Sequence, residues 1–245
     1  MAKEEGGNTH ATRTVIELRK KILSGELPGG TRLLEVPLAE ELEISRTPLR
    51  DAMSRLAEEG LLERGRSGGF VVRRFTIADV IDAIELRGVL EGTAARLAAE
   101  RGVRASALAS LQDIVNRLDA CVGQWPNEVD FEGYAALNAR FHKALAELPG
   151  SDVLAREIER ASRLPFASPS AFVPDRADNA AFSRSLHVGQ SEHRAIVAAI
   201  AAREGSRAEA IAREHARATR QNLEHALGGD ASLFYRVPSL ALVVN

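Results

Sequence analysis

The sequence predicts a mainly α-helical protein, with a winged helix-turn-helix at the N-terminus followed by an all-α helical bundle. Two observations predict this division. Strand-like apolar runs gather at 61–64 and 70–73, on either side of a glycine-rich loop of the kind found in β-hairpins. From Thr76 onward such runs disappear, and alanine-rich amphipathic stretches follow one another. The predicted parts are a disordered N-terminus at 1–11, the winged helix-turn-helix at 12–75, the helical domain at 76–228 and a tail at 229–245.

The whole-chain composition agrees with this organisation. A length of 245 residues leaves enough chain for a sizeable core in the larger domain. A net charge of −2 and a pI near 6.3 exclude a protein that coats nucleic acid through its overall charge, but they permit a local basic face. The single cysteine, Cys121, indicates a reducing compartment. Apolar runs are too short for a membrane span and the polar start has no signal-peptide core, so we expect a cytoplasmic protein without a membrane partner.

Three helical stretches are predicted ahead of the hairpin. The first, at 14–23, has its apolar residues at helical spacing before a Ser-Gly stop. The second, at 36–42, is short and is followed by a two-residue turn, Glu43-Ile44. The third begins at Ser45 and ends at Gly60. A short helix, a tight turn and a second helix are the pattern of a helix-turn-helix.

The start of the third helix has the chemistry that DNA reading requires. Ser45 suits the N-cap position, and Pro48 falls in the first turn, where a missing N–H costs little. Arg46 and Arg50 share a face at i, i+4 spacing, and Thr47 lies beside them. Guanidinium forks at this end can reach guanine edges or phosphates. We therefore interpret this segment as the beginning of a DNA-reading helix.

The predicted hairpin is locally basic. Four arginines, at 64, 66, 73 and 74, face only Glu63 across it, so it suits the wing that lies along phosphate. The alternative is an ordinary small domain with a few surface arginines. The predicted DNA contacts are Ser45, Arg46, Thr47, Arg50, Arg66 and Gly68.

The helical domain begins at Thr76, which can cap a helix whose third position is Asp79, close to a capping box. Breakers separate the helices, and 165–182, rich in proline and serine, is expected to be a mobile connection. The predicted helices are 76–101, 105–122, 130–147, 151–163, 183–204 and 206–227.

Polar residues in this domain occupy helix positions where core residues are expected. Asn138 and His142 are four residues apart on one face, and His193 and His215 fall on apolar stripes of two further helices. Three imidazoles and one amide oxygen brought inward can bind a divalent transition metal, with zinc first and nickel, manganese or cobalt as alternatives. The pattern alone fits equally well with hydrogen-bonded core histidines.

Arg87 raises a similar choice. Val80, Ile84, Arg87 and Glu91 form a single helix stripe, so the guanidinium is expected to point inward. Its simplest role is an ion pair with Glu91. The functional alternative is a fork offered to a ligand carboxylate, which suits a pocket for organic acids.

These motifs together resemble those of a known family. The N-terminal part resembles GntR-family winged helix-turn-helix repressors, above all in LAEELEISRTPLRDA at 38–52. The remainder resembles the FadR-type C-terminal domain (FCD), and the sequence IELRGVLEG at 84–92 is most similar to the VanR-like branch. The further FCD-like motifs are LNARFH at 137–142, EHRAIVAAI at 192–200 and EH at 214–215.

The resemblance implies a homodimer that binds a palindromic operator and carries a metal-containing effector pocket. The metal positions implied are Asn138, His142, His193 and His215, although the first is often Asp in the family. A second departure is Val36, where the FadR type proper has an operator-contacting Arg. The predicted effector contacts are Arg87, Tyr134 and Gln190.

We therefore expect a ligand-responsive transcriptional regulator and not an enzyme: a repressor released from its operator by a small carboxylate or aromatic acid. Two alternatives stay open at this stage. A three-histidine site with an open coordination position can activate water in an enzyme, although no inward Glu or Asp is obviously placed as a general base. A DNA-binding protein can also hold a purely structural metal.

Overall fold

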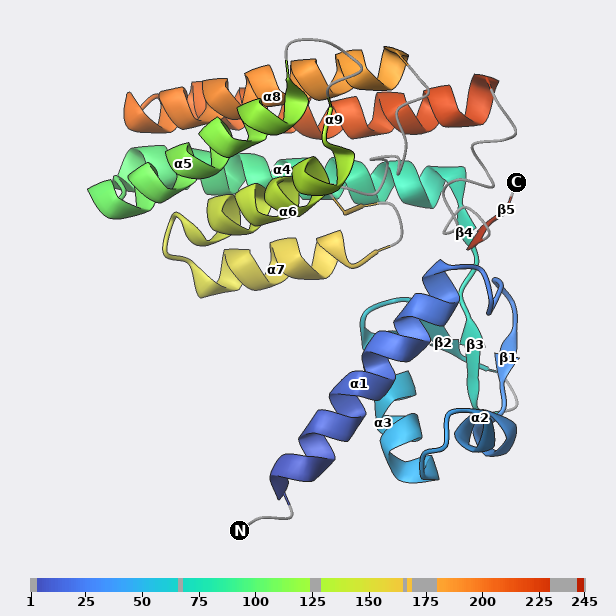
Figure 1. The fold of residues 1–245 in the computed structure, drawn as a ribbon. Helices are drawn as coiled ribbons and strands as arrows, with labels where there is room; N and C mark the ends of the chain where they lie inside the picture. The colour runs from blue at the N-terminus through green and yellow to red at the C-terminus, as the bar shows by residue number, and fades with distance from the viewer. Residues whose placement is uncertain are drawn as a thin grey trace. The chain divides into compact units, whose positions relative to one another are not determined.

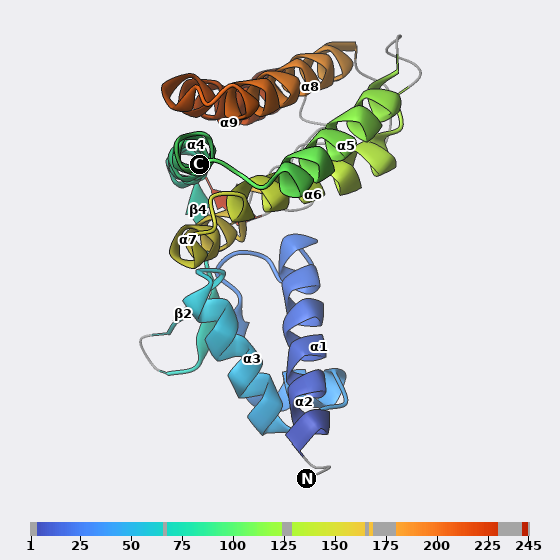
Figure 2. The same ribbon diagram turned by 90° about the vertical axis from the view of Figure 1, so that its left-hand side faces the viewer.

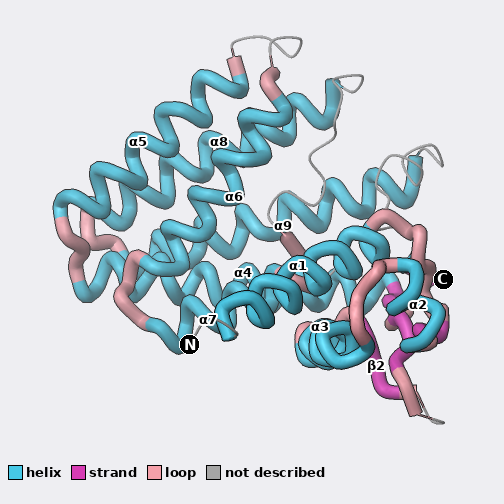
Figure 3. The backbone as a smooth tube through the Cα atoms, turned by 60° about the horizontal axis from the view of Figure 1, so that its bottom comes forward, coloured by secondary structure: helices cyan, strands magenta, loops and turns pink. Residues whose placement is uncertain are grey.

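The computed structural model describes residues 4–65, 68–123, 129–164, 167–168, 180–229 and 242–244. The chain divides into two compact units. One comprises Met1–Val80 together with Phe234–Asn245, and the other comprises Ile81–Leu233. Strands occur only in the first unit among the described residues, whereas helices make up most of both (Figure 3). The prediction of a mainly α-helical protein with a winged helix-turn-helix and a helical bundle is confirmed.

The first unit contains three helices and two small sheets within its described residues. The winged sheet has the strand order β1-β3-β2 and is antiparallel throughout, and β4 pairs with β5 in parallel. Its elements are α1 (Glu4–Leu23), β1 (Arg32–Leu33), α2 (Glu35–Glu41), α3 (Arg46–Glu58), β2 (Leu62–Arg64), β3 (Phe70–Val72), β4 (Phe75–Thr76) and β5 (Val243–Val244), all labelled in Figure 1.

The core of this unit lies between α1, α3 and the sheet. Leu18 and Ile22 of α1 are fully buried, and so are Leu49 and Met53 of α3. Helix α3 ends where predicted, because Gly60 adopts a left-handed φ of +80°, which glycine tolerates best.

Three features of this unit differ from expectation. Helix α1 begins at Glu4 rather than at residue 14, inside the stretch expected to be disordered, since extending a formed helix adds one hydrogen bond for each residue fixed. Strands β1, β4 and β5 were not predicted. Ser45 occupies the N-cap position of α3, as predicted, but its side chain makes no capping hydrogen bond.

The second unit is a bundle of helices. In the end-on view of Figure 2, α8 and α9 lie side by side as one layer, and they also pack closely in the structure. Helix α5 packs against both α6 and α8, and α7 packs against α6. The helices are α4 (Ile77–Arg101), α5 (Ala105–Val122), α6 (Phe131–Glu147), α7 (Asp152–Ser162), α8 (Ala180–Ala201) and α9 (Gly205–Gly229).

The start of α4 shows the expected capping box. The Thr76 backbone N–H donates to the Asp79 carboxylate at 2.8 Å, and the Asp79 N–H donates back to the Thr76 hydroxyl at 3.1 Å. The predicted connection at 165–182 lies mostly outside the described residues, and α8 begins before its predicted end.

Two glycines allow α4 and α9 to approach closely. A β-carbon on Gly88 would lie 2.8 Å from the Ala216 β-carbon. One on Gly92 would lie 2.8 Å from Arg213 Cγ and 3.1 Å from the Glu209 backbone oxygen. The spacing between these helices therefore depends on the absence of side chains at both positions.

No helix within the described part of the chain combines the length and apolar character needed to cross a membrane.

Candidate metal centre and DNA-reading helix

Helix α6 carries two of the predicted metal positions. Asp130 caps the helix by accepting a hydrogen bond from the Gly133 backbone N–H at 2.9 Å. The apolar stripe of α6, which includes the fully buried Phe141, faces the core and draws Asn138 and His142 inward. Both polar side chains are buried.

Three predicted metal positions meet in the structure. His142 on α6, His193 on α8 and His215 on α9 bring potential donor nitrogens within 4.8 Å of one another. The Nε2 atoms of His142 and His215 are 3.3 Å apart, and the rings of His193 and His215 have centroids separated by 4.4 Å. The His193 Nε2 is buried and has no hydrogen-bond partner among the described residues.

Each imidazole is held by a hydrogen-bond acceptor at its other nitrogen. His142 Nδ1 lies 2.9 Å from Glu91 Oε1, and His215 Nδ1 lies 2.9 Å from Glu192 Oε2. Carboxylate oxygens accept, so these Nδ1 atoms donate, and each neutral ring keeps its lone pair on Nε2. Partners of this kind orient the histidines of metal sites.

The tautomer of His193 follows from Gln190. The Gln190 side-chain NH2 donates to the Val115 carbonyl at 2.9 Å and to Asp119 Oδ1 at 2.6 Å, so its oxygen must face the other way. That oxygen lies 3.0 Å from His193 Nδ1, which therefore donates. The Nε2 lone pairs of all three rings are thus turned toward the centre.

Burial favours the neutral form of His142 and His193. Burial lowers the pKa of His142, against the opposing effect of Glu91. Burial also lowers the pKa of His193 well below its ordinary value, aided by the other two histidines. Neutral imidazole is the form that binds metals.

This arrangement fits a divalent transition metal. Two lone pairs 3.3 Å apart repel each other, and a buried nitrogen without a partner is costly. A cation between the three nitrogens removes both penalties, and imidazole nitrogens are preferred ligands of zinc and its neighbours.

Arg87 and Glu91 form a buried ion pair beside the histidines. Arg87 Nη1 donates to Glu91 Oε2 at 3.0 Å, and Nη2 donates to the Thr219 hydroxyl at 3.1 Å. Burial raises the pKa of Glu91, but the charge of Arg87 and the hydrogen bond from His142 outweigh this and bring it to about 2. The structure therefore shows the simpler of the two roles considered for Arg87.

The buried Glu91 is an inward carboxylate beside the histidines, where the sequence indicates no obvious general base. Its two oxygens are occupied, one by Arg87 and the other by His142. A group held in this way positions a ring and balances charge rather than serving as a free base.

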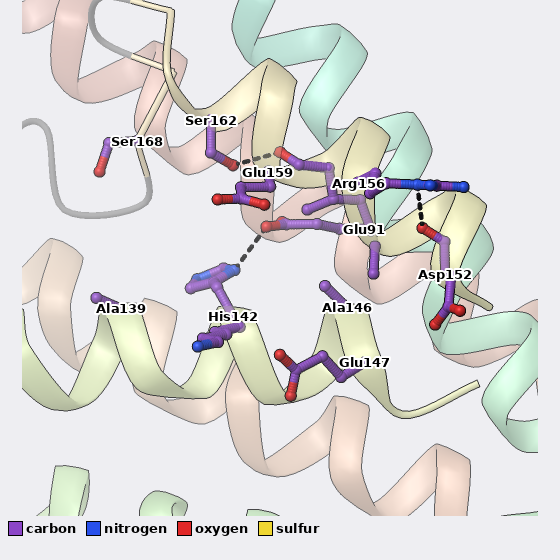
Figure 4. Close-up of a pocket in the computed structure, with 13 residues that line it drawn as sticks. Glu91, Ala139, His142, Ala146, Glu147, Asp152, Arg156, Glu159, Ser162 and Ser168 are labelled. Atoms are coloured by element: carbon purple, nitrogen blue, oxygen red, sulfur yellow. Dashed lines mark hydrogen bonds and ion pairs between the residues drawn. The ribbon is translucent and has the colours of Figure 1, made fainter. Parts of the chain in front are cut away.

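A cavity of about 790 Å³ opens between α4, α6 and α7. Figure 4 shows Glu91 and His142 facing each other at its wall. None of the three predicted effector contacts lines it. The lining residues are Glu91, Ala139, His142, Lys143, Ala146, Glu147, Asp152, Ala155, Arg156, Ile158, Glu159, Ser162 and Ser168.

Tyr134 lies beside the histidines on the side of α8. A β-carbon on Gly189 would be 3.7 Å from the Tyr134 hydroxyl and 3.4 Å from His215 Cε1. Burial raises the pKa of Tyr134, so the buried phenol is neutral. Of the predicted effector contacts, Tyr134 adjoins the centre, whereas Gln190 supports a histidine.

The predicted DNA-reading helix, α3, presents its predicted contact residues to solvent. The Arg46 and Arg50 side chains are 62% and 61% exposed, and Ser45 and Thr47 are exposed as well. Both arginines contact Glu35, at the start of α2.

Of the predicted wing contacts, Gly68 has a left-handed φ of +82° and open space around its α-carbon. Its carbonyl accepts a hydrogen bond from Arg32 at 3.3 Å. Arg66 lies outside the described residues.

Sequence reasoning missed the roles of two residues at the candidate metal centre and of one residue beside the predicted reading helix. Gln190 was predicted to bind effector, and the part played by Glu192 was not predicted; the one usable signal is their place within a turn of His193. For Glu35 the sequence offers no such signal, and its contact with the two arginines is found only in the structure.

Comparison with known proteins matches each of the two parts of the chain to a protein family. Residues 11–72 match the model for bacterial regulatory proteins of the gntR family, and residues 82–218 match the FCD domain.

Individual relatives give the same result. The chain is 34% identical to an HTH-type transcriptional regulator in the TAR-I ttuE-ttuC' intergenic region of Agrobacterium vitis, over 52% of this chain and 74% of the relative. It is 34% identical to the Nta operon transcriptional regulator of Aminobacter aminovorans, over 56% and 63%. The solved structure of E. coli McbR/YncC shares the fold, with a TM-score of 0.62, 22% identity and coverage of 88% and 95%.

Proposed function

This chain belongs to the GntR family of bacterial regulatory proteins and carries an FCD domain, and we infer that a small organic acid controls its binding to DNA. It is a DNA-binding transcriptional regulator and not an enzyme. We assign the reading helix to α3, with Arg46, Thr47 and Arg50 as contacts to the operator. The C2 symmetry of a homodimer would match a palindromic operator.

The observation that carries the ligand response is the three-histidine centre. His142, His193 and His215 would hold a divalent metal, and Asn138, one turn before His142, would complete the set. Zinc is the first choice, with nickel, manganese and cobalt as alternatives. When bound, the metal supplies a positive charge that attracts an anionic ligand.

The neighbouring cavity supports an acidic effector once its charges are counted. Two of its carboxylates are already neutralised, since Glu91 is paired with Arg87 and Glu159 with Arg163. Glu147 and Asp152 then balance Lys143 and Arg156. A divalent ion at the histidines makes the site cationic overall, which favours a small carboxylate. The resemblance of residues 84–92 in α4 to the VanR-like branch suggests that the effector is an aromatic acid.

Release from DNA follows from linkage between the two sites. If the conformation that binds the operator has the lower affinity for effector, ligand binding shifts the population away from it. The coupling required is modest, about 1–3 kcal/mol. We propose that this coupling relieves repression.

The test combines native mass spectrometry and elemental analysis of the purified chain with an operator-release titration. We expect a dimer with one metal per chain, and release by some members of a panel of aromatic and short-chain acids. Removal of the metal with a chelator should raise the acid concentration needed. If the acids release both forms alike, the metal is structural.

A further inference from the structure

Glu35 is an acidic residue placed against the positive side chains that are assigned to read DNA. It opens the short helix α2, and its side chain is 16% exposed. The Arg50 guanidinium donates to it twice, from Nε to Oε1 at 2.9 Å and from Nη2 to Oε2 at 2.8 Å. Arg46 Nη2 approaches the same carboxylate at 3.5 Å.

These contacts contribute little to folding. Ion pairs that solvent reaches give small net stabilisation, because water screens them and because long side chains lose rotamer freedom. Glu35 is 16% exposed, and the two arginines that contact its carboxylate are more than 60% exposed. A charge cluster of this kind at the surface indicates a role other than stability.

The geometry of the Arg50 pair indicates what that role is. Four of the five N–H groups of a guanidinium lie on two edges, a side edge formed by Nε and Nη2 and an end edge formed by Nη1 and Nη2. Glu35 occupies the side edge. The end edge remains available as a fork, and a fork of that shape matches the O6 and N7 acceptors of guanine.

We propose that Glu35 is a positioning residue for sequence reading: it clamps Arg50 side-on, and through a weaker contact Arg46, so that their forks are oriented before DNA arrives. The inference rests on the proposed function of α3. Orienting a flexible side chain in advance removes entropy that binding would otherwise cost. A negative charge beside two cations also weakens their attraction to phosphate, which lowers affinity for random sequence.

The test uses two duplexes, one enriched from a random pool by the wild-type chain and a scrambled duplex of the same composition. Glu35→Gln keeps the shape and removes the charge. We expect its affinity for the enriched duplex to fall about 10-fold, the scale of one bidentate base contact, while affinity for the scrambled duplex does not fall. Glu40→Gln is the matched control, because Glu40 lies on the same helix and, among the described residues, makes no ion pair with either arginine.

Two further variants separate positioning from folding. Arg50→Lys keeps the positive charge but lacks the guanidinium edge that Glu35 binds. It should therefore reproduce the loss of affinity for the enriched duplex. Glu35→Gln should cause much less additional loss on an Arg50→Ala background, because Arg50 is the main partner of Glu35 and only the weaker Arg46 contact remains. The inference is overturned if Glu35→Gln discriminates as well as Glu40→Gln, or if its full effect persists without Arg50.

The outcomes also distinguish this inference from the proposed function. Failure of the wild-type chain to enrich any duplex overturns both. If the wild type enriches a duplex, Arg46→Ala weakens its binding and Glu35→Gln behaves as wild type, only the role of Glu35 is wrong.

Discussion

The reading helix and the histidine centre both use carboxylates to hold nitrogen-bearing side chains, but in opposite environments. Glu35 holds two arginines that are more than half exposed. Glu91 holds Arg87 and His142 where all three side chains are almost wholly excluded from solvent. The same pairing of charges therefore has different consequences in the two units.

At the surface, water screens the charges, and the carboxylate mainly limits the orientations of its partner. In the interior no water stabilises the charges, so each charged group depends on its partner. The pairing also determines which imidazole nitrogen carries the proton. We therefore expect changes in the centre to alter metal content and stability, and changes at the reading helix to alter DNA affinity alone.

The largest effect is expected at the histidines. His193→Ala/His215→Ala should lose nearly all bound metal, since one imidazole and an amide make a poor site, and each single substitution should lower occupancy strongly. Asn138→Asp should retain metal because it adds a negative ligand. Elemental analysis after dialysis measures the metal content. The control is His187→Ala, on the same helix as His193. Stoichiometric metal in the double variant would show that the histidines are ordinary core residues.

The next effect concerns the buried pair. Arg87→Ala should destabilise the fold by about 3–5 kcal/mol, because it leaves Glu91 without its main counter-charge. The exposed pair of Arg207 with Glu204 offers the matched control, and Arg207→Ala should cost about 0–1 kcal/mol. Urea unfolding compares them. If Arg87→Ala is as stable as wild type but needs about 10-fold more effector for release, Arg87 contacts the effector instead.

A smaller effect is expected at the surface. Arg46→Ala or Arg50→Ala should lose about 1–3 kcal/mol of operator affinity with no change in unfolding midpoint, because these side chains are exposed. Arg66→Ala should weaken all duplexes evenly and flatten the salt dependence. Titrations at several salt concentrations separate the two behaviours. Unchanged operator affinity in Arg46→Ala would remove α3 from the role of reading helix.

The smallest effect is a dependence on pH in the metal-free protein. The pKa of His193 is lowered in the fold, so below its ordinary value of 6.5 the unfolded chain takes up a proton that the folded chain does not. Stability is therefore complete above pH 6.5 and falls on acidification, by at most about 1.4 kcal/mol per pH unit. Urea midpoints between pH 8 and 5.5 should show a flatter slope in His193→Asn. Equal slopes would place the titrating group elsewhere.

Periodicity predicted the parts of the molecule that depend on local sequence. The apolar spacing of 105–122 predicted α5 with its observed bounds, and the same reasoning turned His142, His193 and His215 inward. The capping pattern at Thr76 predicted the start of α4.

The remainder depended on contacts between distant segments. Strands β1 and β5 have two residues each, too few for an alternating pattern, and each pairs with a strand far along the chain. Glu192 supports His215 across two helices, a relation that spacing within one helix cannot indicate.

The close contact of α4 with α9 has a consequence for how this sequence can change over generations. Any mutation that adds a side chain at Gly88 or Gly92 must separate the two helices, and with them Glu91 and His215, which lie on opposite sides of the contact. Val89, 40% exposed on the same helix, has no such restriction. In a library of all single substitutions screened for metal retention, we therefore expect positions 88 and 92 to be nearly invariant and position 89 to vary freely.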